Sequence, residues 1–238
     1  MLRPIAMFLI AAIAAMPLSA KKKKEESKED KYADYYIEAY LKDGSVIKGY
    51  NRTNFTGGAE QLEISAAPKG KADRYDSELV DSIVFPPSDT GQRRVVWETM
   101  YAQPWMMKGL FNRKNMSKHP QFLRRIYIGE NIKAYTMPYI DKTQAANGIG
   151  GMTTINTLRT KYYFRPLTTD TARCYWADMG GIMIGFGKGF DKVMKDYPEI
   201  IKMRKDKVFS KKEFLNDPTI ILPHIDAVIG ERKNATDK

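Results

Sequence analysis

Side chains suited to acid, base or metal chemistry are few in this sequence. The 238 residues include two histidines, His119 and His224, and one cysteine, Cys174. A zinc site needs His, Cys and carboxylate ligands close together, and these three residues are widely separated in the chain. The sequence therefore predicts no metal and no cofactor, and only a composite site assembled by the fold would change that expectation.

No residue carries a recognisable catalytic signature. Cys174 alternates with Ala172 and Trp176 on an expected strand, a pattern that favours a buried, inert thiol over a nucleophile. The stretch GFGKGF at 185–190 resembles a phosphate-binding loop, but Phe190 stands where the third glycine of that motif belongs. We interpret this stretch as a turn from strand to helix, and we assign no catalytic or cofactor-binding residue.

Aromatic residues are the remaining chemical resource. Trp97, Tyr101 and Trp105 fall within the run WETMYAQPWMM, which could form an exposed recognition patch for a glycan or a partner protein. The same three rings recur every four residues, so they would also form one stripe of a helix packed in a core. The core interpretation is the favoured one.

The first twenty residues have the features of a secretory signal peptide. Arg3 precedes an uncharged apolar run over 5–16, which is short for a membrane span because spanning takes about 20 residues. We expect cleavage between Ala20 and Lys21, which leaves no transmembrane segment; an uncleaved anchor is the alternative. Residues 21–31 mix both charges without an apolar side chain, which predicts a flexible tether. The expected location is outside the cytoplasm: periplasmic, outer-membrane associated or secreted.

The charge balance suggests the class of partner. The chain has 39 Lys and Arg against 28 Asp and Glu, a formal net charge of +11. Such an excess is typical of nucleic-acid binding, but the signal peptide makes an anionic glycan or another envelope protein the expected partner, and no nucleic acid. Much of the excess lies at 21–24 and 202–207, where a solvated tail and helix face would also explain it. The oligomeric state is left open.

Residues 32–87 alternate apolar and polar side chains in five short runs. The first two flank Asp43-Gly44, which predicts a β-hairpin closed by a two-residue type I′ turn. The last run ends at Pro86-Pro87, because proline stops strand pairing. Five short strands in so short a stretch indicate a small β-barrel-like module, which would leave few edges exposed.

The rest of the chain predicts an α+β domain over 92–230. An antiparallel sheet is expected over 92–177, with a second hairpin that turns near 129–131. The apolar spacing then becomes helical, which predicts helices within 187–229 laid against that sheet. Residues 231–238 are predicted to be a disordered tail. The overall fold class is therefore α+β.

Several signals mark where the expected helices begin. Ser210 and Glu213 have the spacing of a capping box, and Asp217-Pro218 marks another helix start. Pro198 is placed to open a helix. Pro223 falls inside the last apolar run, which it should kink or divide.

Four stretches give the chain a resemblance to a known group of proteins. They are YLKDGSVIKGY with the LEIS and YDSELVDSIVF that follow it, RRIYIGENIKAYT, YYFRP and GFDKVMKDYPEII. Together they resemble exported Bacteroidetes proteins without an established activity, which pair a small β-barrel-like segment with a β-rich middle and a helical end. The first stretch is also similar to Sm-like and SH3-like barrels. The resemblance implies O-glycosylation at Asp-Ser/Thr motifs, here Ser82 and Thr171.

One function and two alternatives follow from the sequence. We expect an exported, non-enzymatic binding or interaction module of the bacterial envelope. The first alternative is an envelope hydrolase with a composite active site, which His119 or His224 would have to share with carboxylates. The second is Sm-like nucleic-acid binding, which the signal peptide disfavours.

Overall fold

The computed structural model describes residues 35–88, 91, 93–103, 117–146, 152–178 and 186–236. Ten strands precede several short helices, so the predicted α+β class is confirmed. The strands are β1 (Tyr36–Leu41), β2 (Val46–Asn51), β3 (Gln61–Ser65), β4 (Ala72–Asp76), β5 (Val80–Phe85), β6 (Val95–Gln103), β7 (Gln121–Ile128), β8 (Ile132–Ala146), β9 (Met152–Pro166) and β10 (Thr171–Ala177). The helices are α2 (Lys188–Val193), α3 (Pro198–Lys205), α4 (Lys211–Asn216), the 3₁₀ turn η1 (Pro218–Ile221) and α5 (Leu222–Thr236).

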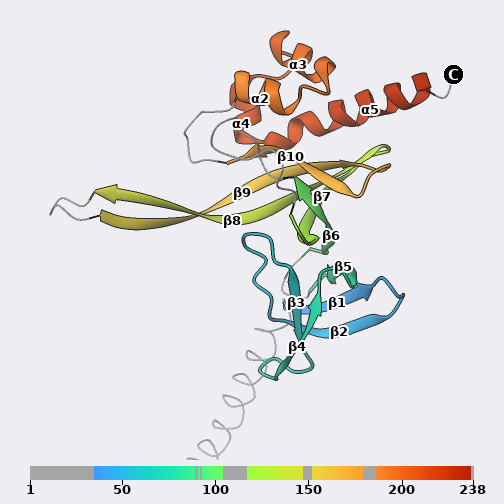
Figure 1. Ribbon diagram of the computed structural model, residues 1–238, viewed down its shortest axis with the longest axis vertical. Helices are drawn as coiled ribbons and strands as arrows, with labels where there is room; N and C mark the ends of the chain where they lie inside the picture. Colours follow the sequence, from blue (N-terminus) through green and yellow to red (C-terminus); the bar gives the residue numbers. More distant parts are fainter. Residues whose placement is uncertain are drawn as a thin grey trace, which may run out of the picture.

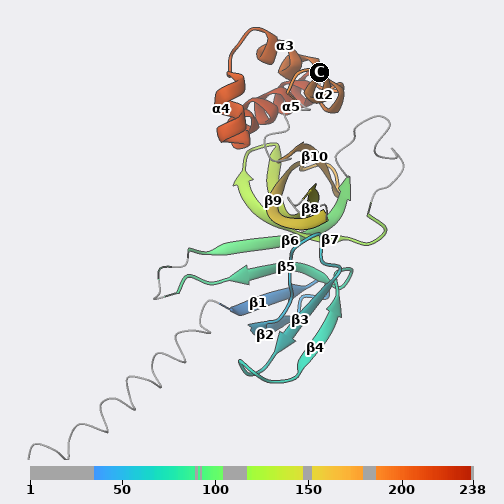
Figure 2. The same ribbon diagram turned by 90° about the vertical axis from the view of Figure 1, so that its left-hand side faces the viewer.

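The described strands belong to one continuous sheet (Figure 1). Its order is β10-β9-β8-β7-β6-β5-β1-β2-β3-β4, and β10 pairs a second time with β6. Neighbours in this order are antiparallel, whereas β10 and β6 are parallel. The extra pairing closes β6 to β10 into a ring, which Figure 2 shows nearly end-on, and leaves β1 to β5 as an extension beside it.

The N-terminal module has its five predicted strands, but a closed barrel is not confirmed. A strand has two edges, and those of β5 pair with β1 and β6, so β5 has none left for β4. The module still has an apolar core, in which Phe55 stacks on Trp97 with ring centroids 4.4 Å apart and meets Phe122 edge-on. Because Trp97 lies on β6 and Phe122 on β7, the two halves of the chain share a sheet and part of a core.

The first hairpin is present, but its turn is not the predicted type I′. That turn needs a positive φ at both central residues, and Lys207 is the single non-glycine with a positive φ among the described residues. Instead, a three-residue loop ends at Gly44, whose φ is 87° and whose N–H donates to Leu41 O at 3.0 Å. The Asp43 carboxylate accepts from the Ser45 N–H at 2.8 Å. A type I turn followed by a left-handed glycine therefore closes the hairpin.

The strand register identifies the side chains inside the ring, because paired residues point to the same face. Tyr163 pairs with Tyr135 on one side and with Cys174 on the other. All three are buried, as are Met100 and Leu123 on the same face. The predicted burial of Cys174 is confirmed.

The helices cover the outer face of β8, β9 and β10 (Figure 1). Phe164 of β9 packs edge-on against Tyr197, with centroids 5.5 Å apart. Trp176 of β10 packs edge-on against Phe214 of α4 at 5.0 Å. The expected packing of the helical region on the preceding sheet is therefore confirmed. No helix in the described ranges has the length and apolar character needed to cross a membrane.

Most of the helix signals in the sequence are confirmed. Glu213 donates its N–H to Ser210 Oγ at 3.1 Å, and Ser210 donates its N–H to the Glu213 carboxylate at 2.8 Å, which completes the capping box. Pro198 opens α3, and Pro223 is the second residue of α5, where its missing N–H costs nothing. The last apolar run is thus divided between η1 and α5.

The predicted disordered tail over 231–238 is wrong as far as Thr236, where α5 ends. The helix continues because its last turns contact α3. Arg232 forms an ion pair with Glu199 at 2.6 Å and donates to the Asp196 carbonyl at 2.7 Å. Residues 237–238 lie outside the described part.

Candidate ligand-binding site

The aromatic residues singled out in the sequence do not gather into an exposed patch in the described structure. Trp97 and Tyr101 lie on the strand β6, so the alternative of a helix stripe is wrong here. Both edges of β6 are paired, and its alternation sends Trp97 into the N-terminal core, where it is 8% exposed. Tyr101 is half-buried. Trp105 lies outside the described residues.

The modification and cleavage sites named from the sequence fall in three places. Ser82 lies on β5 and is half-buried. Thr171 begins β10, where its hydroxyl donates to the Asp170 carboxylate at 3.1 Å. Ala20 and Lys21 lie outside the described residues. O-glycosylation at Ser82 and Thr171 stays a prediction.

The two histidines do not share a site. His119 precedes β7 and bonds to the Glu78 carboxylate at 2.9 Å. His224 lies on α5, where its ring stacks on Phe209 with centroids 6.2 Å apart. No cluster of three or more His, Cys, Asp or Glu side chains suited to a metal ion occurs in the part of the chain described.

A pocket of about 490 Å³ opens where the ring meets the N-terminal module, and we call it the junction pocket. Strands β1 and β5 form one wall, and β6 to β9 supply the others. Its lining comprises Tyr40, Asp81, Ser82, Val84, Arg94, Val96, Glu98, Thr99, Met100, Arg125, Lys133 and Arg165. Four of these side chains are cations and two are carboxylates, so the lining has a net positive charge.

Glu98 is the centre of the polar part of this pocket. Its side chain is 12% exposed and accepts from Arg125 at 2.6 Å and from Lys133 at 3.0 Å. The Tyr135 hydroxyl donates to the other carboxylate oxygen at 2.7 Å, and Arg165 approaches that oxygen to 4.0 Å. Each group comes from a different strand of β6 to β9, except that Lys133 and Tyr135 share β8. The closed ring therefore assembles the cluster.

Two opposing effects act on the pKa of Glu98. Burial raises it, whereas the hydrogen bonds from Tyr135, Lys133 and Arg125 and the charge of Lys133 lower it. The attractive contacts outweigh burial, so the pKa lies below the usual 4.5 and the carboxylate is ionised at neutral pH. Burial and the nearby Glu98 charge raise the pKa of Tyr135, which keeps that hydroxyl a donor.

Positive charge remains in the junction pocket after Glu98 is counted. One guanidinium N–H of Arg165 donates to Thr169 O at 3.0 Å. The Nε atom of the same side chain is buried and has no hydrogen-bond partner among the described residues. Arg94 is exposed at the rim and forms no ion pair within the described ranges. A ligand cannot reach the buried Nε atom, but the Arg165 side chain is 20% exposed, and an anion in the pocket would bind that part of it.

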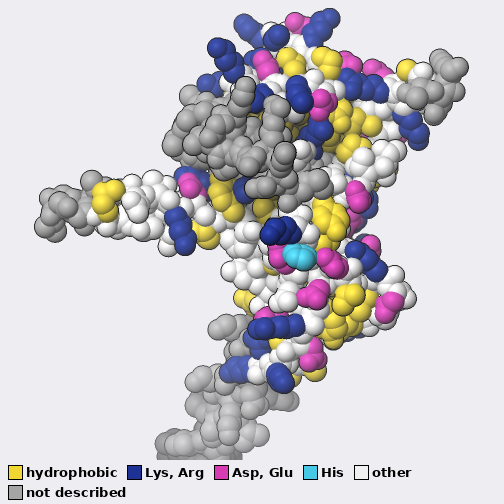
Figure 3. All heavy atoms as spheres, viewed as in Figure 1, with side chains coloured by type: hydrophobic (Ala, Val, Ile, Leu, Met, Phe, Trp, Pro, Cys, Tyr) yellow, Lys and Arg dark blue, Asp and Glu magenta, His cyan; other side chains and the backbone are white. Residues whose placement is uncertain are grey.

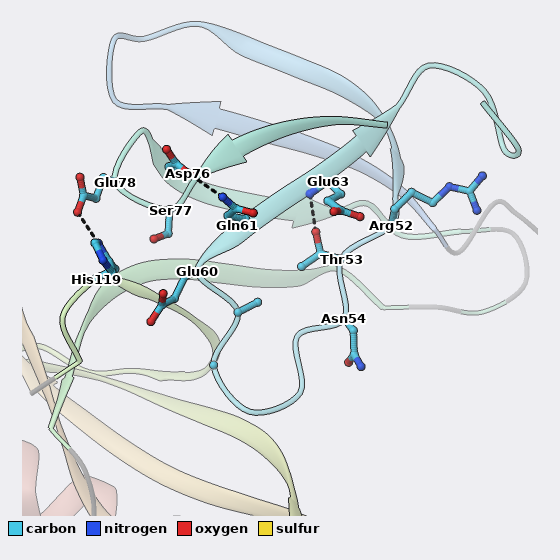
Figure 4. Close-up of a pocket in the computed structure, with 12 residues that line it drawn as sticks. Arg52, Thr53, Asn54, Glu60, Gln61, Glu63, Asp76, Ser77, Glu78 and His119 are labelled. Atoms are coloured by element: carbon cyan, nitrogen blue, oxygen red, sulfur yellow. Dashed lines mark hydrogen bonds and ion pairs between the residues drawn. The ribbon is translucent and has the colours of Figure 1, made fainter. Parts of the chain in front are cut away.

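A second hollow of about 720 Å³ lies on the N-terminal module, and we call it the acidic groove (Figure 4). Its charged lining residues are Arg52, Glu60, Glu63, Asp76, Glu78 and His119. Most of its acids are already paired. Glu63 bonds to Arg74 at 2.8 Å and Asp76 to Gln61 at 3.0 Å, in addition to the His119 contact of Glu78. The groove is open to solvent, so these pairs are worth little.

The acidic groove satisfies part of the condition set for an enzyme, because His119 does meet carboxylates. The bond from Glu78 raises the pKa of His119 above 6.5, against a smaller lowering by desolvation, and the charges of Glu60 and Asp76 add to the increase. The serine of the groove, Ser77, is not placed as a nucleophile, because it is buried and donates to Pro120 O at 2.6 Å. The groove therefore offers His119 as a general base, and a water molecule would have to serve as the nucleophile.

Sequence reasoning missed the residues of the junction pocket. A usable signal existed, because Glu98 interrupts the strand VVWETMYA and Arg165 follows the three aromatic residues of YYFRP, each a charge within an apolar stretch. A charge on the core face of a strand needs a partner of opposite sign. The sequence does not say which partner, because Arg125 and Lys133 lie on other strands.

No protein-family model matches the chain, and no match is found among curated proteins or solved structures.

Proposed function

We propose that the protein is an exported, non-enzymatic binding module of the bacterial envelope, and that the junction pocket binds an acidic group of an anionic glycan. The observation that supports this most is the surplus of cations around Glu98, because the pocket lining has four cations and two carboxylates. Guanidinium groups bind carboxylate, sulfate and phosphate through paired hydrogen bonds, which suits a ligand of this charge.

Glu98 has a positioning role in this proposal. Its bonds to Arg125 and Lys133 hold both cations in place before any ligand arrives. A ligand anion would then contact the exposed part of the Arg165 side chain and the rim residue Arg94. Because the cations are ordered beforehand, binding loses less side-chain entropy than it would at flexible surface lysines.

Export is the second part of the proposal. It is supported by the apolar run over 5–16, the expected cleavage after Ala20 and the resemblance to exported Bacteroidetes proteins. Mass spectrometry of the N-terminus of the protein from its native cells tests it. A chain that begins at Lys21 in the envelope or medium supports export, and a chain that retains residues 1–20 in the cytoplasm contradicts it.

The binding proposal is tested by calorimetry with a tri-galacturonate probe and neutral maltotriose for comparison. Arg94→Met removes a rim cation that touches no other charged group of the cluster, so the fold should be unaffected. We expect the variant to bind tri-galacturonate about fivefold more weakly, as the loss of about 1 kcal/mol implies. Arg93→Met is the matched control, because Arg93 is an exposed neighbour that does not line the pocket. Equal binding of both sugars, or equal effects of both variants, would refute the site.

An envelope hydrolase stays as a second candidate because His119 lies beside Glu78 in the acidic groove. A histidine held by a carboxylate is a common general base, and here it would activate water. Hydrolysis of ester or glycoside panels that is lost in His119→Ala and kept in His224→Ala would establish this activity. Nucleic-acid binding by the N-terminal module is placed last, since the carboxylates of the groove would repel phosphate.

A further inference from the structure

Strands β8 and β9 continue beyond the ring as a two-stranded ribbon, residues 138–146 and 152–160, which we call the arm (Figure 1). β7 pairs with β8 only as far as Thr136, and β10 pairs with β9 only as far out as Lys161. Within the described residues, neither edge of the arm is paired with a further strand. A ribbon of two strands is marginally stable in water, so the arm would gain from an additional strand.

Two hydrogen bonds show which backbone groups point outward. Pro138 O accepts from the Gly57 N–H at 2.7 Å, so even-numbered residues of β8 direct their backbone groups away from β9. Thr160 O accepts from the Asp178 N–H at 2.9 Å, so even-numbered residues of β9 point away from β8. The pairing of β8 with β9 has no bulge, so this parity continues along the arm.

The two edges differ in how they are protected against pairing. Natural edge strands resist association through proline and lysine. The β8 edge has both, with Pro138 and Lys142. The β9 edge over Met152–Leu158 reads MTTINTL, which has no charge, no proline and no glycine. Such a segment favours strand pairing. The β9 edge is therefore the one open to a further strand.

We propose that this edge pairs with the same edge of a second copy of the chain, antiparallel about a two-fold axis at Ile155. In this register Ile155 faces its own copy, and Met152 faces Leu158 of the second copy. These three side chains are 50%, 65% and 65% exposed in the single chain. Each large exposed apolar side chain of the β9 edge thus meets another, which is the self-complementarity that a two-fold interface requires.

The same register also pairs the outward backbone N–H and C=O groups of β9. The outward residues Thr154 and Asn156 face each other across the axis and exchange both of their hydrogen bonds, as hydrogen-bonded antiparallel pairs do. Ile155 falls on a non-hydrogen-bonded pair, where opposite side chains lie closest. No two like charges face each other within the overlap, because it contains no charged residue. The product is a four-stranded sheet in the order β8-β9-β9-β8.

Figure 3 shows the arm projecting from the body of the molecule, with hydrophobic side chains near its outer end. The overlap over residues 152–158 lies on the part of β9 that β10 does not reach. The junction pocket lies outside the overlap, so each copy would keep its own binding site.

Sedimentation velocity of the full chain over a range of concentrations tests the pairing. Asn156→Pro removes one outward N–H from the β9 edge, and we expect it to weaken the dimer by about tenfold or more, because each copy loses a hydrogen bond. Gln144→Pro is the matched control, since it removes an outward N–H from the β8 edge and should leave dimerisation unchanged. Circular dichroism checks that both variants keep the sheet.

Crosslinking tests the register separately. Ile155→Cys places two thiols across the axis, where Cα atoms of such a pair lie about 4.5 Å apart, within disulfide reach. Mild oxidation should link the Ile155→Cys chain into a covalent dimer. Thr143→Cys is the control, because Thr143 lies opposite Ile155 on the other strand of the arm. A monomeric chain at every concentration, equal effects of the two proline variants, or equal crosslinking of the two cysteine variants would overturn the proposal.

Discussion

Gly129 and Asp226 fit together because Gly129 has no side chain. The Asp226 carboxylate of α5 reaches the turn between β7 and β8, where it accepts from the backbone N–H groups of Glu130, Asn131 and Ile132 at 3.0, 2.7 and 3.0 Å. A Cβ added to Gly129 would lie 2.4 Å from Asp226 Oδ2, which is closer than real Cβ contacts allow. The last helix is thereby fixed to the second hairpin of the sheet.

Removal of the Asp226 carboxylate should destabilise the fold. Asp226→Ala leaves backbone donors without an acceptor, and we expect the free energy of unfolding to fall by about 2–3 kcal/mol. Gly129→Ala should weaken the same contacts by displacing the carboxylate. Urea denaturation measures both, with Glu231→Ala, an exposed change on the same helix, as the control. A loss no larger than that of the control would refute the role of this contact.

Glu98 should make the free energy of unfolding depend on pH in the acidic range. Its pKa in the folded chain is lower than the usual 4.5, so the stabilisation is present above that value and is lost as the pH falls through the folded pKa. Glu98→Gln should flatten this dependence. It should also cost about 3 kcal/mol at neutral pH, because Arg125 and Lys133 lose a largely buried partner. Denaturation between pH 7 and pH 3 checks both effects, with Glu63→Gln at a more exposed pair as the comparison; identical pH profiles would contradict the prediction.

The bond from Glu78 should be visible in the titration of His119. The pKa of His119 is raised above 6.5 chiefly by this bond. The pair therefore stabilises the fold at low pH, and the effect is lost as the pH rises through the raised pKa. Glu78→Gln should move the pKa of His119 back toward 6.5. NMR titration of the imidazole signals in a His224→Asn background gives the value directly, and no movement would mean that the pair does not form in solution.

Cys174 should resist thiol reagents in the folded protein. Burial raises its pKa to about 12, so almost no thiolate exists at neutral pH. We expect alkylation by iodoacetamide to be slow in buffer and fast in denaturant. Thr143→Cys adds an exposed thiol that should react at once in either condition. Rapid labelling of Cys174 in the native chain would contradict its position inside the ring.

The parts of the fold predicted well are those that depend on neighbours in the sequence. Pro86-Pro87 identified the end of β5, and the spacing of Ser210 and Glu213 identified the start of α4, because strand ends and helix caps depend on residues a few positions apart. The turn at Gly44 was predicted with the right glycine and the wrong geometry. A glycine permits several turns, and the pairing of the strands selects one.

The residues of the junction pocket are set by contacts distant in the sequence. Glu98, Arg125, Lys133 and Arg165 lie on four strands and meet because β10 returns to pair with β6. The pairing of β6 with β5 and β7 also excludes an exposed aromatic patch at Trp97, because it directs this side chain into the N-terminal core. By itself the sequence determined the α+β class, most of the strands and the helix starts. The ring and the charge cluster within it were decided by tertiary structure, because strand partners are chosen by packing between segments far apart in the chain.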